Sequence, residues 1–130
     1  MGIAKAQFNN ILSNIFKSGN IIRLFKTMPD ASTETGGEVV GSSYTIQSGD
    51  FTVSGGQAYS VKNMPIYLCE TSGGDGIAVG FGVYYASTLY YFGEFSEPMT
   101  ISYNTYPTIK KYDSAKGEGI KVTLTSTDIS

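Results

Sequence analysis

Short apolar runs separated by glycine-bearing turns make up most of the chain after residue 20, and this pattern constrains the fold more than any other feature. Turn signals such as Ser48-Gly49-Asp50, Gly55-Gly56 and Ser72-Gly73-Gly74-Asp75-Gly76 interrupt the runs. Spacing of ~8–12 residues between such turns is typical of antiparallel sandwiches and barrels. We therefore predict a mostly β fold: a single-domain β-sandwich or barrel over residues 1–130, with about eight short antiparallel strands from residue 21 onward.

The clearest of the predicted strands covers residues 77–85. One face of it carries bulky side chains, whereas Gly80 and Gly82 leave the other face nearly bare. A bare glycine face indicates that a ring or another backbone packs closely against it. The other strands are predicted at residues 21–26, 44–47, 51–53, 65–70, 89–95, 100–103 and 120–124.

Apolar residues spaced by three and four predict one helix over residues 3–18. Its apolar stripe comprises Ala4, Phe8, Ile11, Leu12, Ile15 and Phe16. We expect Lys17 in the last turn and Gly19 in a left-handed conformation to end the helix. Asparagines within it are poor helix formers, so the helix needs a surface on which to dock. Phe8 and Ile11 are therefore candidate interface residues, which cover either the end of the sandwich or a neighbouring copy.

The residues needed for common catalytic sites are missing from this sequence. The chain has no histidine, which excludes a histidine-based triad, and a single cysteine, Cys69, which is too few for a typical zinc site. Cys69 lies in an apolar run and is predicted to be a buried, inert thiol. The glycines of residues 73–82 lack the Gly-Lys-Ser/Thr ending of a phosphate loop. We predict no catalytic residue, no cofactor and no metal, and thus a protein that is not an enzyme.

Carboxylates offer the two alternatives to that interpretation. Paired acids could support glycoside hydrolysis, and the candidates are Asp50, Asp75, Glu94, Glu97 and Asp113. Asp30, Glu34 and Glu38 share one loop and could hold a calcium ion, although their spacing matches no known loop motif. Most of these residues lie in predicted turns, where Asp is common for conformational reasons. We favour neither alternative.

Charge is scarce and unevenly distributed. Charged residues make up 15% of the chain and its net charge is −2, which argues against a nucleic-acid partner. Residues 1–28 carry four basic side chains and no acid, whereas residues 30–97 carry only Lys62 as a base. This asymmetry favours head-to-tail contacts between copies, and a closed ring of three would satisfy them. We therefore expect a homotrimer.

The apolar runs are too short for a membrane-spanning helix, which needs about 20 residues, so we expect no membrane contact. The first residues also lack the pattern of a secretory signal, which predicts assembly in a cytoplasm.

Three tyrosines, Tyr103, Tyr106 and Tyr112, lie in one polar segment. Tyrosine combines a flat apolar ring with a hydrogen-bonding tip, which suits protein interfaces and sugar stacking. These residues are candidate interface positions, and a host glycan is a possible ligand. The alternative is that each ring packs over an edge of the sandwich.

The order of motifs resembles a group of small phage virion proteins described as tail-fibre or minor structural proteins, with a character similar to head decoration proteins. After the helix and the first strand come Met28-Pro29-Asp30 and then Gly37-Glu38-Val39-Val40-Gly41-Ser42-Ser43-Tyr44. A proline-led strand follows, then Val79-Gly80-Phe81-Gly82-Val83 and a strand pair that ends at Glu97-Pro98. A tryptophan–glycine pair usual in that group is absent here, because the chain has no tryptophan.

The resemblance implies a non-enzymatic structural component of a phage particle, built as a small β-sandwich. Its location would be the virion, assembled in the host cytoplasm, and its partners would be copies of itself and other virion proteins. A head decoration (cement) protein and a tail protein both fit. The alternative is a module of a receptor-binding apparatus that recognises a host-surface glycan.

Overall fold

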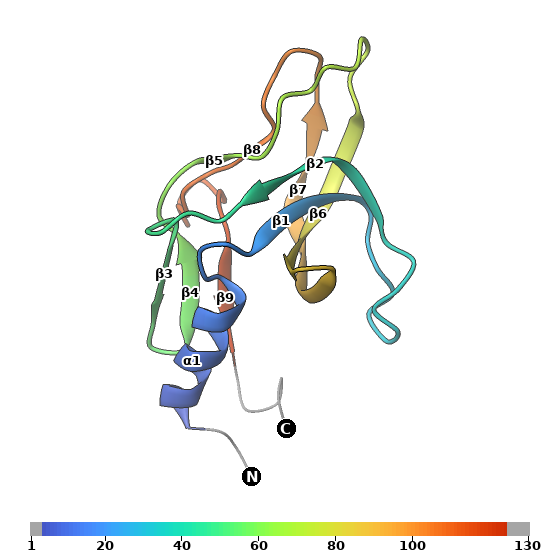
Figure 1. Cartoon of the computed structure of the whole chain (residues 1–130). Helices are drawn as coiled ribbons and strands as arrows, with labels where there is room; N and C mark the ends of the chain where they lie inside the picture. The colour runs from blue at the N-terminus through green and yellow to red at the C-terminus, as the bar shows by residue number, and fades with distance from the viewer. Residues whose placement is uncertain (1–3, 125–130) are drawn as a thin grey trace.

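The computed structural model describes residues 4–124 and shows a mostly β chain with one helix near its N-terminus (Figure 1). The fold class predicted from the turn spacing is thus confirmed. The elements are α1 (Lys5–Ile15), β1 (Ile21–Thr27), β2 (Glu38–Thr45), β3 (Phe51–Ser54), β4 (Gln57–Ser60), β5 (Met64–Pro65), β6 (Gly76–Tyr85), β7 (Thr88–Ile101), β8 (Thr108–Ile109) and β9 (Lys121–Thr123).

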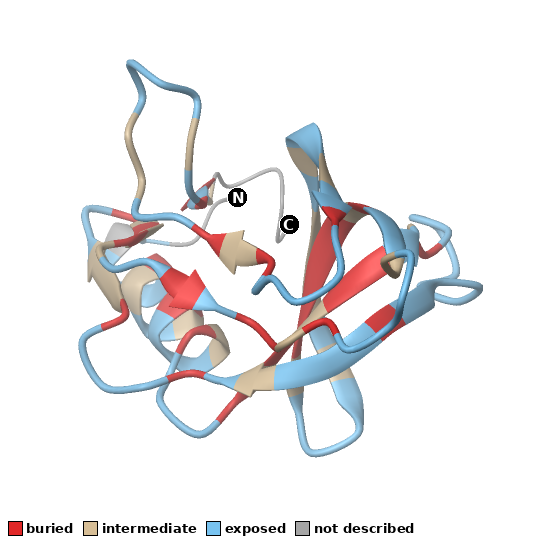
Figure 2. Ribbon diagram, turned by 90° about the horizontal axis from the view of Figure 1, so that it is seen from above, coloured by how far each residue is buried: buried red, intermediate tan, exposed pale blue. Residues whose placement is uncertain are grey.

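These strands form three antiparallel sheets. A four-stranded sheet has the order β2-β1-β6-β7, a three-stranded sheet has the order β3-β4-β9, and β5 pairs with β8. Buried side chains from the two larger sheets and from α1 form one hydrophobic core, as in a small sandwich. The loops around the periphery are mostly exposed (Figure 2).

The helix docks on the smaller sheet, and its C-terminal end differs from the prediction. Phe8, Leu12 and Phe16 recur at intervals of four and are buried, and α1 packs against β3 and β4. The helix ends at Ile15, because the side chain of Asn20 donates hydrogen bonds to the carbonyls of Asn14 (3.0 Å) and Ile15 (2.9 Å). Gly19 has the expected left-handed conformation (φ 96°), but the expectation that it and Lys17 would end the helix is wrong, because both lie beyond Ile15.

The glycine face of β6 is covered, as predicted. A side chain at Gly82 would lie 2.7 Å from the Phe25 ring and 2.9 Å from Leu89, and one at Gly80 would meet Met28 and the backbone of β7. The strict alternation predicted for this strand breaks between Ala78 and Gly80, where the register with β7 shifts. Ala78 therefore joins the core instead of the glycine face.

Several strand boundaries also differ from the prediction. Of the strand predicted at residues 65–70, only Pro65 lies in β5; the rest is irregular and bonds to residues 105 and 107 through Cys69 and Ile66. The strand predicted at 89–95 and the first two residues of the one predicted at 100–103 belong to the single strand β7, whose pairing with β6 is interrupted between Glu94 and Met99. The strand β2 begins at Glu38, earlier than expected, and β4 and β8 were not predicted. Within residues 4–124, no helix has the length and apolar character needed to cross a membrane.

Candidate binding groove

A groove of about 610 Å³ runs between the outer edge of β7 and the segment that contains β8 and β9. Its first wall is formed by residues 91 and 93–99, and its second wall by residues 108–110, 112, 114 and 117–122. This volume falls within the ~300–1,000 Å³ common for ligand sites. Both walls thus come from one stretch of the chain, residues 91–122, although their strands belong to different sheets.

The groove exists because strand pairing stops on both sides of it. The strand β7 is the last strand of the four-stranded sheet, and β9 is the last strand of the three-stranded sheet. Among the described residues, no backbone hydrogen bond joins residues 93–99 to the facing wall. The sandwich is therefore open along this side, and Pro98 within β7 fits the free edge because proline cannot donate to a ladder.

The floor of the groove is apolar and aromatic. The ring of Phe81 lies 5.8 Å from that of Phe95 and 5.9 Å from that of Tyr91, measured between ring centroids. Phe81 is 4% exposed, whereas Tyr91 and Phe95 are half-buried, so part of each of the two outer rings reaches the groove. Val122 lines the opposite side of the floor. Aromatic rings of this kind contribute strongly to the free energy of binding when a partner covers them.

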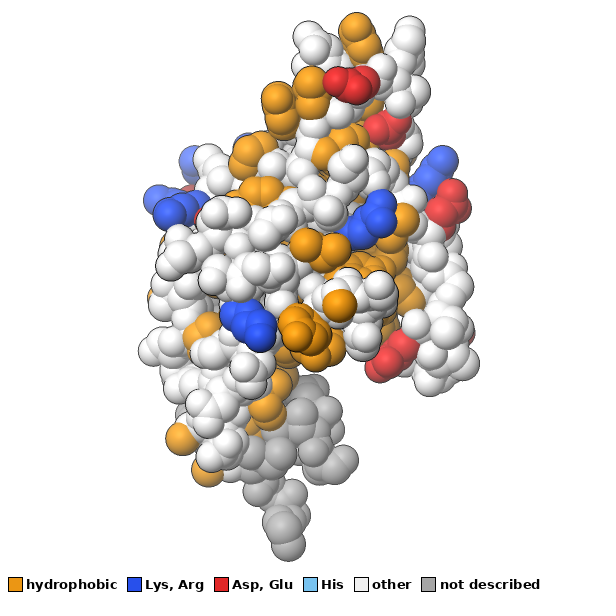
Figure 3. Space-filling model, in the orientation of Figure 1, with side chains coloured by type: hydrophobic (Ala, Val, Ile, Leu, Met, Phe, Trp, Pro, Cys, Tyr) orange, Lys and Arg blue, Asp and Glu red, His pale blue; other side chains and the backbone are white. Residues whose placement is uncertain are grey.

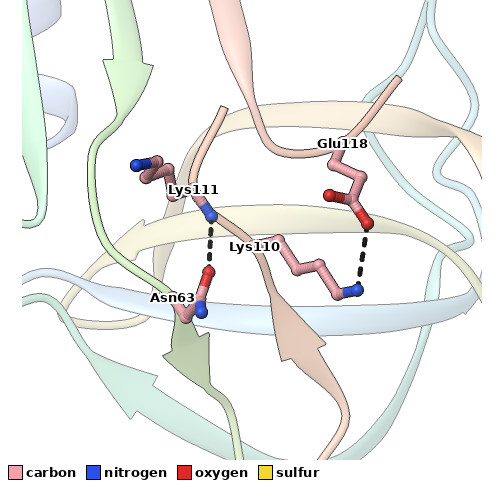
Figure 4. Close-up of polar contacts among 4 residues, drawn as sticks. All are labelled: Asn63, Lys110, Lys111 and Glu118. Carbon is pink, nitrogen blue, oxygen red and sulfur yellow. Dashed lines mark hydrogen bonds and ion pairs between the residues drawn. The ribbon is translucent and has the colours of Figure 1, made fainter. Parts of the chain in front are cut away.

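On the wall that contains β8 and β9, the rim carries one ion pair and also Lys121, which lies over the Tyr112 ring and forms no ion pair with a described residue; on the β7 wall it carries two carboxylates. On the second wall, Nζ of Lys110 lies 2.9 Å from Oε2 of Glu118. Next to Lys110 in sequence, the backbone N–H of Lys111 donates to the side chain of Asn63 at 2.9 Å (Figure 4). On the β7 wall, Glu94 and Glu97 are exposed, and neither forms an ion pair with any residue in the described part of the chain. The groove therefore presents uncompensated negative charge along β7.

The structure separates the candidate interface residues predicted from the sequence. Phe8 is buried against Gly56 and so serves the docking of α1 in this chain, whereas Ile11 is half-buried. Tyr103 and Tyr106 are 59% and 56% exposed on the loop after β7, at the far end of the molecule from α1 (Figure 1). Tyr112 lines the groove, where Lys121 lies 5.6 Å above its ring.

The aspartates at positions 30 and 50, which were considered for chemistry, accept hydrogen bonds from residues close to them in sequence. Asp50 is buried and accepts from the Tyr44 hydroxyl (2.6 Å) and from the backbone N–H of Gln47 (2.8 Å). Asp30 accepts from Ser32 and Thr33 within its own turn, and the Ser32 hydroxyl is the largest cause of a lowered pKa of Asp30. In residues 4–124 no three Cys, Asp or Glu side chains gather closely enough to hold a metal ion. Cys69 is fully buried, as predicted.

Reasoning from sequence missed the groove itself. Glu94 and Glu97 were considered only as a catalytic pair, and Pro98 only as an interruption of a strand. The proline was a usable signal, since it indicates an edge strand.

Comparisons of the chain with protein-family models, with curated proteins and with solved structures find no match.

Proposed function

We propose that this protein is a structural component of a phage particle, a head decoration (cement) or tail protein that acts through protein–protein contacts and not through catalysis. The observation that carries this proposal is the groove, in which an apolar floor lies between β7 and β9, each the last strand of its sheet in the described part of the chain. An open edge in a folded domain is a template for pairing with another chain. The order of sequence motifs resembles that of small virion proteins, and this resemblance is the reason to propose a phage particle as the location.

The sparsely charged surface supports a role in assembly. Charged side chains are few and scattered on the face shown in Figure 3, between neutral polar and hydrophobic groups. Such a surface suits burial against neighbours, because fewer charges lose their hydration when it is covered. We propose that the particle contains the protein as a homotrimer with head-to-tail contacts.

The folded chain partly mixes the basic and acidic regions that motivated the trimer. Lys26 lies near Gly76 and lowers the pKa of Asp75, after the larger effects of hydrogen bonds from Thr71 and Tyr67.

Sedimentation velocity of the purified chain at tens of micromolar measures the oligomeric state directly. A trimer is expected, and a monomer at that concentration would reject a trimer that forms away from the particle.

A host glycan is the second candidate ligand, and the exposure of Tyr103 and Tyr106 favours it. Two tyrosines more than half exposed on one loop present flat apolar faces on which a sugar ring could stack. A glycan array probed with the chain and with Tyr106→Ala tests this function. Hits that disappear in the variant would support it, and an array without hits would remove it.

Mass spectrometry of intact purified particles tests the primary proposal. A structural component remains in mature particles after gradient purification, whereas an assembly factor such as a scaffold or chaperone leaves before maturation. We expect peptides of this chain in the mature particle. Their absence there, with their presence in immature precursors, would assign the chain to assembly only.

A further inference from the structure

We propose that Tyr103 and Tyr106 of one copy insert into the groove of the next copy, so that the loop after β7 and the groove form the head-to-tail contact of the homotrimer. The inference rests on the proposed function and deepens it by naming the two surfaces that meet. It uses three features of the described residues: a loop fixed by hydrogen bonds, the apolar floor of the groove and the mixed charge of its rim.

The loop of residues 102–107 is fixed by hydrogen bonds of its backbone. The N–H of Asn104 donates to the carbonyl of Cys69 at 2.8 Å, and the N–H of Cys69 donates to the carbonyl of Thr105 at 2.9 Å. The Thr105 hydroxyl closes the turn by donating to the carbonyl of Ser102 at 2.7 Å. A loop held in this way loses little further backbone freedom when a partner covers it, which lowers the entropic cost of binding.

The two tyrosine rings of this loop are left uncovered. Tyr103 and Tyr106 are 59% and 56% exposed, and within residues 4–124 no other ring or cation packs on either of them. The exposed ring of Tyr85, in contrast, lies 5.7 Å from that of Tyr90 and 5.0 Å from Nζ of Lys17. Aromatic side chains bury ~150–250 Å² each, so the exposed halves of two rings supply roughly a quarter of the ~800 Å² that each partner of a stable interface buries.

The floor of the groove offers apolar groups for these rings to contact. Phe95 and Met99 line the β7 wall and are half-buried, and the ring of Phe95 stacks on the buried ring of Phe81 at 5.8 Å and 24°. A tyrosine ring can lie against the remaining face of Phe95 and against the thioether of Met99, which is a favourable neighbour of aromatic rings. The contact uses side chains and needs no main-chain pairing with β7.

The charges of the rim favour an occupant without charge. The rim carries Glu94 and Glu97 on the β7 wall and Lys121 on the facing wall, together with one ion pair. An acidic segment would be repelled by one of these walls and a basic segment by the other. Residues 102–107 carry no charged side chain. A tyrosine hydroxyl can both donate to a carboxylate and accept from an ammonium group, so it suits a rim of both signs.

A second copy is the occupant because one chain carries both surfaces and does not join them itself. The exposure of Tyr103 and Tyr106 shows that neither ring is covered within its own chain, and the loop lies at the end of the molecule far from α1 (Figure 1). Each copy can thus receive the loop of one neighbour and offer its own loop to the other. Such a heterologous contact closes into a ring when the rotation between copies allows it, and a threefold rotation gives the proposed trimer.

Sedimentation velocity of variants tests the two surfaces separately. The loop variant combines Tyr103→Ser with Tyr106→Ser, and the groove variant Met99→Lys places a charge at a half-buried apolar position. Each should raise the dissociation constant of self-association at least about tenfold. The control Tyr90→Ser removes a tyrosine that is 46% exposed outside the groove, and it should associate like wild type.

Thermal unfolding checks that each variant is folded. If Met99→Lys lowers the melting temperature, Ser96→Trp replaces it, because this exposed position on the same wall can be enlarged to obstruct the groove without a change in the core. The same tenfold loss of association is expected for Ser96→Trp.

Mixing the two variants gives the sharper test. The loop variant keeps an intact groove and the groove variant keeps an intact loop, so a head-to-tail contact lets the two chains pair although neither associates with itself. We expect a heterodimer in the one-to-one mixture. A benzophenone crosslinker at position 106 of the groove variant should attach to residues 93–99 or 108–122 of an isotope-labelled loop variant.

Four results would overturn the inference: a wild-type chain that stays monomeric at hundreds of micromolar, an oligomer that both variants leave intact, a mixture without heterodimer, or crosslinks outside the groove. Loss of glycan binding in Tyr106→Ala with unchanged sedimentation would likewise overturn it and assign the tyrosines to a glycan. The proposed function is decided separately by the presence of the chain in purified particles. A confirmed contact in a chain absent from particles would reject the function alone.

Discussion

The Tyr67 hydroxyl donates a 2.6 Å hydrogen bond to Oδ2 of Asp75 and so joins the irregular segment after β5 to the turn before β6. The ring of Tyr67 also fills the space over Gly41 in β2, where any Cβ atom would clash with it. Burial raises the pKa of Tyr67, and hydrogen bonds from Thr71 and Tyr67 lower the pKa of Asp75. Side chains, and not paired strands, thus attach this irregular segment to the four-stranded sheet.

Acid should weaken this contact. The pKa of Asp75 in the folded protein lies below its ordinary value of 3.8, so its contribution to stability is present above that pH and is lost as the pH falls further. Thermal unfolding followed by circular dichroism from pH 7 to pH 2 should show a smaller acid-induced decline for Asp75→Asn than for wild type. The control Glu70→Gln, an exposed carboxylate, should follow wild type. Parallel curves for Asp75→Asn and wild type would contradict the assignment.

Alkali should weaken the equivalent contact of Tyr44. Burial, with the hydrogen bond to Asp50, raises the pKa of Tyr44 from 10.0 to about 12. A raised pKa means that the contribution is complete below pH 10 and is lost as the pH rises through about 12. Urea unfolding at pH 8 and at pH 11.5 should show a smaller difference for Tyr44→Phe than for wild type. An unchanged difference would show that ionisation of Tyr44 is not coupled to folding.

Substitution of the β6 glycines should damage the fold. Valine at position 82 would overlap Phe25 and Leu89, and valine at position 80 would overlap the backbone of β7, so each variant should lose ~1–3 kcal/mol or more of unfolding free energy. Urea unfolding measures the loss. Thr45→Val, at an exposed position of β2, is the control and should change stability little. Wild-type stability in both glycine variants would mean that the second face of β6 is open to solvent.

Removing the cap of α1 should destabilise the helix end. Asn20 is 2% exposed, and Asn20→Ala would leave the carbonyls of Asn14 and Ile15 without this donor. We expect a loss of about 1–3 kcal/mol in unfolding free energy. Asn10→Ala removes an exposed asparagine from the same helix and should cost much less. Equal losses in the two variants would show that Asn20 does not cap the helix.

Local signals in the sequence predicted the parts of the fold that depend on local physics. Alternation predicted β6 and its covered glycine face, and the three–four spacing predicted α1, since each pattern reports which side of an element is buried. The helix end could not be predicted in this way, because Asn20 acts through a side chain that folds back by six residues. The bulge that moves Ala78 into the core depends on how β7 pairs with β6, which no single segment encodes.

The groove was harder to predict than these elements, because the order of strands in a sheet decides which strand lies at its edge. The segment Leu89–Phe95 was correctly predicted as a strand, yet nothing within it states that β7 is the last strand of its sheet. The position of Glu94 and Glu97 on one wall of the groove, with the ion pair of Lys110 and Glu118 on the other wall, follows only from how β7 lies beside β8 and β9. Tyr103 and Tyr106 were singled out from composition, and the structure adds their exposure but not their ligand.

The central claim, the proposed structural role in a phage particle, is tested most directly by counting copies of the chain in purified particles of a phage whose genome carries its gene. Isotope-labelled reference peptides, compared with those of the major shell protein, give copies per particle after gradient purification and a high-salt wash. The account predicts a fixed number of copies that is a multiple of three. Loss of the chain to trace amounts in infectious particles would contradict it.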